Sequence, residues 1–263
     1  MRQQRNNRMK KLFLGLNMAL LSLLAISCAD KTPGAEGKPG TDGDIKTVQI
    51  DKQVWMAENM AVTTDAEGKP LALNTNYTVA DGAYLYDWET AQRICPKGWH
   101  TPTKDEFTVL VKNAGFESGA ELAGNKTSWA ADNKLAGSEN FGRTHFNAIP
   151  SGYFFKDKAD TTSKGKVYGK YYNANFWSSD LVKHKVDKES DSLKNIAKNY
   201  GITVEDIQKW NNLPADKLAV NKDTELTICR GYCLTVNYDS EDATVGTVNC
   251  DFRMSVRCIR DAK

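Results

Sequence analysis

Apolar and polar residues alternate in two parts of the chain. The first part spans residues 45–56, where two short alternating runs stand on either side of Asp51-Lys52. The second part runs from Tyr232 to Ile259. Because successive side chains of a strand point to opposite faces, a period of two predicts half-buried strands, and the polar pair predicts a hairpin turn.

Helical spacing follows the first strands. Residues 87–94 show it and are followed by Cys95-Pro96, which stops a helix. A second helix is predicted to begin after Thr103, because Thr103 and Glu106 form the sequence of a capping box. Residues 115–180 show little periodicity, which is typical of long loops around short strands.

Residues 183–228 have a pattern of their own. Segments 190–201 and 203–213 each repeat apolar residues at helical spacing, and each begins with a capping residue. We expect their apolar residues, Trp210 included, to form one small core. The flanking runs read as short strands, which gives the order β-α-α-β with the strands at 185–187 and 225–228.

The N-terminus has the composition of a secretory signal. Residues 1–27 carry five basic residues and no acid, and their uncharged stretch is too short to span a bilayer comfortably. Removing them changes the formal net charge from +2 to −3, with 30 basic and 33 acidic residues left. A mildly acidic chain lacks the basic footprint of a nucleic-acid partner, so none is expected.

The end of this leader, Leu24-Ala25-Ile26-Ser27-Cys28, resembles the lipobox of bacterial lipoproteins. The resemblance implies a lipid on Cys28 and an exported protein, and we favour attachment to the outer membrane, on its periplasmic face or at the cell surface. The alternative is an ordinary leader with Cys28 as a disulfide cysteine. Glycine at every third position from Gly34 to Gly43 predicts that residues 28–44 form a flexible tether, since a collagen helix needs many more triplets.

Six ordered blocks resemble the Fibrobacter succinogenes major paralogous domain. The resemblance implies an α+β fold similar to C-type lectins over 45–182 and 229–263, and an exported, often lipid-anchored protein without a defined activity. The blocks are Thr47-Val-Gln-Ile50, Gln53-Val-Trp-Met-Ala-Glu-Asn59, Cys95-Pro-Lys-Gly-Trp-His100, Phe146-Asn-Ala-Ile-Pro150, Phe176-Trp-Ser-Ser179 and Ser255-Val-Arg-Cys-Ile-Arg-Asp261.

The inserted pattern, Asp191-Ser-Leu-x-x-Ile-Ala-x-x-Tyr-Gly-Ile-Thr-Val-x-x-Ile-x-x-Trp-Asn-Asn-Leu213, resembles a LysM domain over 183–228. LysM domains bind glycans that contain N-acetylglucosamine in a groove between two loops. Ser190 stands where that family usually has glycine, and 220–223 lacks its usual Pro-Gly-Gln. The glycan-binding residues that the resemblance implies are Ser190, Asp191, Ser192, Leu193, Lys194, Leu213, Pro214, Ala215, Asp216, Lys217 and Leu218.

Export makes disulfides plausible for the cysteines other than Cys28. The lectin-like resemblance implies a bond between Cys95 and Cys258. A hairpin turning at 240–243 would place Cys233 opposite Cys250, which predicts a Cys233–Cys250 bond. Cys229 could replace Cys233 or remain the odd thiol, because spacing does not fix connectivity.

No residue pattern favours a metal, a cofactor or catalysis. The three histidines fall at unrelated spacings, and the acidic run at 239–242 is typical of a solvated turn. The run Ser255-Val-Arg-Cys258-Ile-Arg260 resembles the cysteine motif of L,D-transpeptidases, but Arg257 stands at its glycine and its upstream His-Gly is missing. We therefore expect a protein that is not an enzyme.

These features together predict a lipid-anchored envelope protein that binds peptidoglycan or another N-acetylglucosamine polymer through LysM. One alternative is a structural or adhesive surface protein whose LysM is vestigial. The other is an L,D-transpeptidase-like enzyme with Cys258 as the nucleophile.

Overall fold

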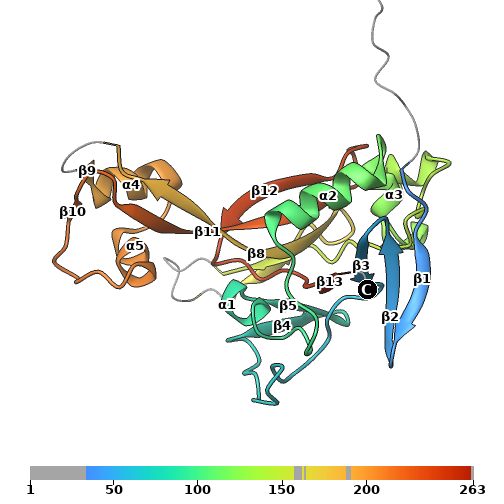
Figure 1. The fold of residues 1–263 in the computed structure, drawn as a ribbon, viewed down its shortest axis with the longest axis horizontal. Coiled ribbons are helices and arrows are strands. Elements are labelled where there is room, and N and C mark those ends of the chain that lie inside the picture. Colours follow the sequence, from blue (N-terminus) through green and yellow to red (C-terminus); the bar gives the residue numbers. More distant parts are fainter. Residues whose placement is uncertain (1–33, 157–161, 163, 188–190, 262–263) are drawn as a thin grey trace, which may run out of the picture. The chain divides into compact units, whose positions relative to one another are not determined.

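The computed structural model describes residues 34–156, 162, 164–187 and 191–261 and shows a mixed α/β protein rich in sheet (Figure 1). Its elements follow one another as β1 (Lys38–Asp42), β2 (Ile45–Ile50), β3 (Gln53–Met56), β4 (Tyr77–Ala80), β5 (Ala83–Tyr86), α1 (Trp88–Ala91), α2 (Lys104–Ala114), α3 (Ser118–Leu122), η1 (Lys126–Ser128), η2 (Leu135–Gly137), β6 (Tyr153–Phe155), β7 (Lys166–Tyr168), β8 (Asn173–Lys185), β9 (Asp191–Ser192), α4 (Leu193–Tyr200), α5 (Val204–Trp210), β10 (Ala219–Val220), β11 (Glu225–Asn237), β12 (Thr244–Asn249) and β13 (Ile259–Asp261).

The first sheet has the antiparallel order β1-β2-β3-β13. Strands β2 and β3 form the hairpin expected around Asp51-Lys52, with Ile50 opposite Gln53. Asp51 adopts a positive φ of 51°, a conformation that Asp tolerates in tight turns. Strand β13 pairs with β3, so the end of the chain completes a sheet begun near residue 38.

Helix α2 begins as the sequence predicts. The Thr103 hydroxyl accepts a hydrogen bond from the Glu106 N–H, and the Glu106 carboxylate accepts one from the Thr103 N–H. Helix α1 is shorter than the predicted 87–94, because it ends at Ala91 after a single turn capped by Asp87.

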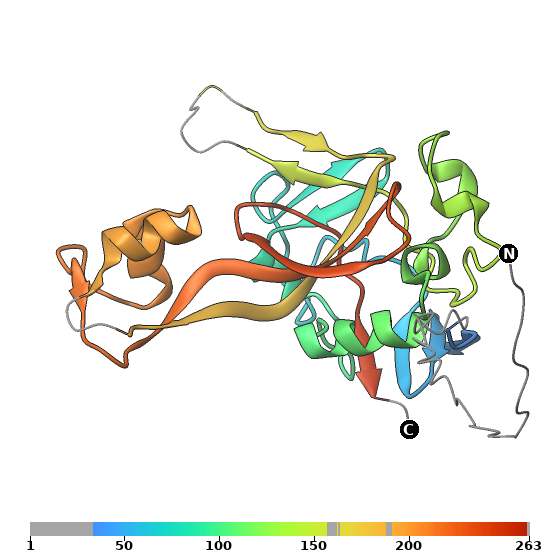
Figure 2. The same cartoon turned by 90° about the horizontal axis from the view of Figure 1, so that it is seen from above.

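The second sheet has the order β12-β11-β8, and its two long strands lead to a small helical module around α4 and α5. Strands β8 and β11 are thirteen residues long and pair from Asn173–Asn237 to Lys185–Glu225. They extend from β12 to helices α4 and α5, as Figures 1 and 2 show. Their register is irregular between Thr227 and Cys233. Ile228 on one side of this irregularity belongs to the apolar cluster around α4 and α5, and Cys233 on the other side belongs to the cluster around Trp177.

Residues 183–228 have the β-α-α-β order that their periodicity predicts, because residues 183–185 of β8 pair with 225–227 of β11. The first strand ends at Lys185, so the strand expected at 185–187 is wrong for residues 186–187. This segment also contains the short pair β9–β10, which the sequence did not indicate. Trp210 was predicted to be a core residue, and that prediction is wrong, since Trp210 is half-buried against Trp88. The core of the segment consists of Val186, Leu193, Ile196, Ala197, Ile207, Val220, Leu226 and Ile228.

The tether predicted for 28–44 is wrong for residues 34–44, while 28–33 lie outside the described residues. Strand β1 pairs with β2 over its full length. Ala35 and Gly37 donate backbone hydrogen bonds to Asn113 and Arg143. Because glycine has no Cβ, the backbone at Gly34 can lie directly against the backbone of Ala114, and the backbone at Gly37 against that of Thr144.

Candidate functional site

The two loops predicted to bind glycan lie side by side at the outer end of the inserted module. Ala219 pairs with Ser192 and Val220 with Asp191 in the β9–β10 ladder. The Leu193 N–H then donates to the Leu218 carbonyl at 2.9 Å. Backbone pairing therefore fixes residues 191–193 against 218–220, and Ser190 lies outside the described residues.

Gln208 holds the second loop in place. Its side chain is 6% exposed, and its Nε2 donates to the carbonyls of Ala215 at 2.9 Å and Lys217 at 2.8 Å. A buried amide whose two N–H groups are both satisfied fixes the loop geometry, because each lost bond would leave a desolvated polar group. Gln208 is not among the residues predicted for the site, and the only sequence signal for it is a polar residue next to the apolar stripe of this helix.

The predicted residues differ in what they offer a ligand. Leu193 is fully buried in the core of the module, and Leu213 packs against that core. Both side chains therefore stabilise the loops by packing inside the module. The Ser192 hydroxyl caps α4 by accepting from the Asn195 N–H at 3.2 Å. The exposed members are Lys194, Pro214, Ala215, Asp216, Lys217 and Leu218, of which Leu218 is 64% exposed.

These loops present both apolar and polar groups to solvent. Leu218 presents an apolar surface, and the flanking lysines and Asp216 present groups that donate or accept hydrogen bonds. Sugar rings have both apolar faces and polar edges. Among the described residues, no group of three or more His, Cys, Asp or Glu side chains is placed to hold a metal ion.

A concavity of about 720 Å³ lies outside residues 183–228. Lys170 and Asp81 form an ion pair there, and Tyr171 is 51% exposed with a positive φ of 70°. The hydrogen bond to Asp81 raises the pKa of Lys170. An exposed tyrosine beside an ion pair gives this concavity a polar lining, and none of these residues stands in a recognisable sequence motif.

Arg257 forms part of the wall of this concavity and is 1% exposed. Its guanidinium donates five hydrogen bonds, two to Asn59 Oδ1 and three to the carbonyls of Met56, Phe146 and Asn147. All of its N–H groups are thus engaged within the protein. Burial lowers the pKa of Arg257 to about 9, so the group stays charged at neutral pH and acts as a structural tie.

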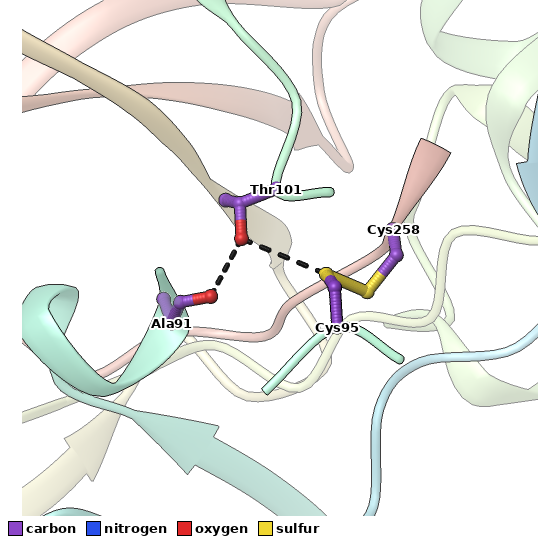
Figure 3. Close-up of a disulfide and its surroundings, with 4 residues drawn as sticks. All are labelled: Ala91, Cys95, Thr101 and Cys258. Carbon is purple, nitrogen blue, oxygen red and sulfur yellow. Dashed lines mark hydrogen bonds between the residues drawn. A yellow bond between two sulfur atoms is a disulfide. The ribbon is translucent and has the colours of Figure 1, made fainter. Parts of the chain in front are cut away.

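Cys95 and Cys258 form a disulfide, as the resemblance implied (Figure 3). The Thr101 hydroxyl donates to the Ala91 carbonyl at 2.5 Å and lies 3.6 Å from Cys95 Sγ, so it packs beside the bond. A sulfur held in this bond is not a thiolate. The transpeptidase-like alternative therefore lacks its nucleophile in this structure.

The predicted Cys233–Cys250 bond is wrong in register. Cys233 lies opposite Gly246 in the β11–β12 ladder. The β11–β12 ladder is displaced from the predicted register because residues 241–243 are hydrogen-bonded to α3. The Gly119 N–H donates to the Glu241 carbonyl at 2.8 Å, and the Ala243 N–H donates to the Ser118 hydroxyl. The connection is therefore longer than the short turn that the prediction assumed.

The structure defines a mixed α/β protein of antiparallel sheets, with a small helical module carried on two long strands and a disulfide that joins distant segments. The profile of the Fibrobacter succinogenes major domain matches residues 48–260, and the chain belongs to this family. No curated protein and no solved structure matches the chain significantly. Within the described residues, no helix has the length and apolarity needed to cross a membrane.

Proposed function

We propose that this protein is an exported, lipid-anchored envelope protein that binds N-acetylglucosamine polymers through a LysM domain at 183–228, without catalysis. The observation that carries the proposal is the pairing of β9 with β10. It brings the two loops of the predicted site together and leaves the side chain of Leu218 exposed, next to Lys217 in the chain.

The way the module joins its host supports this assignment. Its entering and leaving strands pair with each other, Leu226 opposite His184 and Thr227 opposite Lys183. Two ends that lie side by side allow a module to be inserted without opening the host core. Its apolar core is also separate from the clusters around Trp55 and Trp177 in the host.

For the host we propose a C-type-lectin-like fold. Two features support it: β13 closes the sheet that β2 and β3 begin, and Cys95 after α1 is joined to Cys258 just before β13. The host then acts as a scaffold that displays the module.

Lipidation of Cys28 is the part of the proposal that rests on sequence alone. Cells grown with an alkyne fatty acid should label the wild-type protein, and the Cys28→Ser variant should lose the label. Cys250→Ser is the matched control and should keep it. Label retained by Cys28→Ser would overturn the anchor and leave glycan binding to be judged separately.

The glycan site is tested by sedimentation with insoluble peptidoglycan and with chitin. The detergent-solubilised full-length protein should sediment with at least one of them. Leu218→Asp should lower the retained fraction at least tenfold, because a charge replaces the exposed apolar side chain of the predicted site. Leu73→Asp is the matched control, since Leu73 is an exposed leucine of the host, and it should sediment like wild type.

Two outcomes would overturn the proposal. If folded wild-type protein sediments with neither polymer, the module does not bind these glycans, and retention of a protein partner instead would favour the structural or adhesive alternative. If Leu218→Asp and Leu73→Asp are retained equally, glycan binding does not use Leu218 and the loop that carries it.

A further inference from the structure

Cys229 and Cys250 lie opposite each other where the β11–β12 ladder ends. Arg230 pairs with Asn249, so the next opposed position holds the two cysteines. The Cys250 N–H donates to the Cys229 carbonyl at 3.3 Å. Their thiols are also in hydrogen-bond contact, and this contact together with burial raises the pKa of the Cys250 thiol.

This position is the base of the inserted module. Cys229 lies two residues after Thr227, the last residue of β11 that pairs with the Lys183–Lys185 segment, and therefore within the irregular register. Next to it, the Arg230 guanidinium donates to the Tyr200 carbonyl of α4 at 3.2 Å and to the Thr247 carbonyl of β12 at 2.9 Å. The last turn of α4 and strand β12 are thus already connected through this point.

Opposed positions of an antiparallel ladder have the separation that a disulfide requires. Their Cα atoms lie about 4.5–5.5 Å apart, within the usual disulfide range of about 4.4–6.8 Å. Cys233 has a different setting, since it is 2% exposed, lies opposite Gly246 and contacts the Thr235 hydroxyl. Of the three cysteines in this sheet, the register therefore favours only one pair.

We propose that Cys229 and Cys250 form a second disulfide by thiol–disulfide exchange, and that this bond fastens the base of the inserted module to β12. The oxidant is a disulfide donor, either a dithiol oxidoreductase or an oxidised small thiol. This inference does not depend on glycan binding.

The exchange balances as two displacements. The thiolate of one cysteine attacks a sulfur of the donor, so a mixed disulfide forms and the donor releases its other sulfur as a thiolate. The thiolate of the second cysteine then attacks the protein sulfur of the mixed disulfide and displaces the donor sulfur. The two cysteines lose two protons and two electrons, and the donor gains both as two thiols.

The test is a peptide map of the full-length protein after incubation with oxidised glutathione. Unreacted thiols are alkylated without reduction, and the protein is digested with trypsin and with a protease that cleaves before aspartate. Cleavage at Arg230, Asp239 and Asp242 puts Cys229, Cys233 and Cys250 on separate peptides. We expect residues 223–230 joined to 242–250, and Cys233 alkylated.

Variants separate the pair from chance oxidation. Cys233→Ser should give the same cross-linked peptide, whereas Cys229→Ser should leave Cys250 alkylated. A Cys233–Cys250 peptide in the wild type would overturn the proposal, as would alkylation of all three cysteines after oxidation. Hydrogen exchange of residues 225–229 should also be slower in the oxidised than in the reduced wild type, and equal rates would refute the fastening role.

Discussion

The indole of Trp88 in α1 packs edge-on against the indole of Trp210 at the end of α5, with ring centroids 5.4 Å apart and planes at 65°. Trp88 is fixed in the host by a hydrogen bond from its Nε1 to the Ser178 carbonyl at 2.9 Å. Lys209 lies 3.7 Å from Glu89 beside the same contact. The inserted module therefore has a side contact with its host in addition to its two connecting strands.

This contact predicts a measurable coupling between the two rings. In a double-mutant cycle with Trp88→Ala and Trp210→Ala, the coupling free energy of unfolding should be about 0.5–1.5 kcal/mol, the usual value for an aromatic pair. Trp88→Ala combined with Leu218→Ala is the control and should be additive, because Leu218 is on the exposed loop. Zero coupling between the tryptophans would show that the contact does not stabilise the protein.

Replacement of Arg257 should be strongly destabilising. Arg257→Met removes the donors from buried carbonyls of Met56, Phe146 and Asn147, and each unsatisfied group costs about 1–3 kcal/mol. We expect a loss of at least about 3 kcal/mol in urea unfolding. Lys46→Met is the control: the Lys46 side chain is 68% exposed and that of its partner Glu58 is 66% exposed, so its loss should change the unfolding free energy far less.

Gly37 should tolerate no side chain. A Cβ there would overlap the Thr144 carbonyl and lie 2.8 Å from Val48 Cγ2, so Gly37→Ala must displace either β1 or the segment around Thr144. We expect a loss of about 1–3 kcal/mol and faster proteolysis near Lys38. Gly137→Ala is the control, because a Cβ at Gly137 meets nothing within 4 Å, and equal stability of the two variants would contradict this packing.

Glu121 should make stability depend on pH. Burial raises the pKa of Glu121. The hydrogen bond from the Gly34 N–H and the nearby Arg143 charge favour the carboxylate and lower this pKa, but they do not cancel the effect of burial. The neighbouring Glu117 raises the pKa further. At a pH between the ordinary pKa of a glutamate and the raised pKa of Glu121, the folded protein binds more protons than the unfolded chain. The contribution of Glu121 to the free energy of unfolding therefore falls as pH rises through this range.

The matching variant is Glu121→Gln, which keeps an acceptor for Gly34 and has no charge. The unfolding free energy of Glu121→Gln minus that of wild type should increase as pH rises from about 4 to about 7. Taking the difference cancels the other titrating groups. A difference that is flat or falls with pH would show that the folded state does not disfavour the Glu121 carboxylate.

Several elements could be predicted because their signals are local. The caps at Thr103 and Thr203 lie within three residues of the groups they satisfy, and the structure has both capping boxes. The β2–β3 hairpin closes across two residues. The family blocks were also readable along the chain, and the family match confirms them.

The predictions that failed depend on contacts between distant residues. Ser118 and Gly119 set the position of residues 241–243 and thereby the partner of Cys250, which symmetry about a turn could not reveal. The spaced glycines resemble a flexible tether in the sequence. Nothing near them in the chain indicates that the Thr144 carbonyl packs directly against Gly37 in the folded protein.

The sequence by itself determined the local elements, the family and the location of the inserted pattern, because helix caps, hairpin turns and strand alternation depend on neighbours a few residues away. Only the tertiary structure decided that residues 38–42 form a strand, that Cys229 lies opposite Cys250 and that Trp210 packs against the host. The physical reason is that each of these depends on backbone and side-chain packing between segments far apart in the chain, whose alignment is fixed only when the sheets and cores form together.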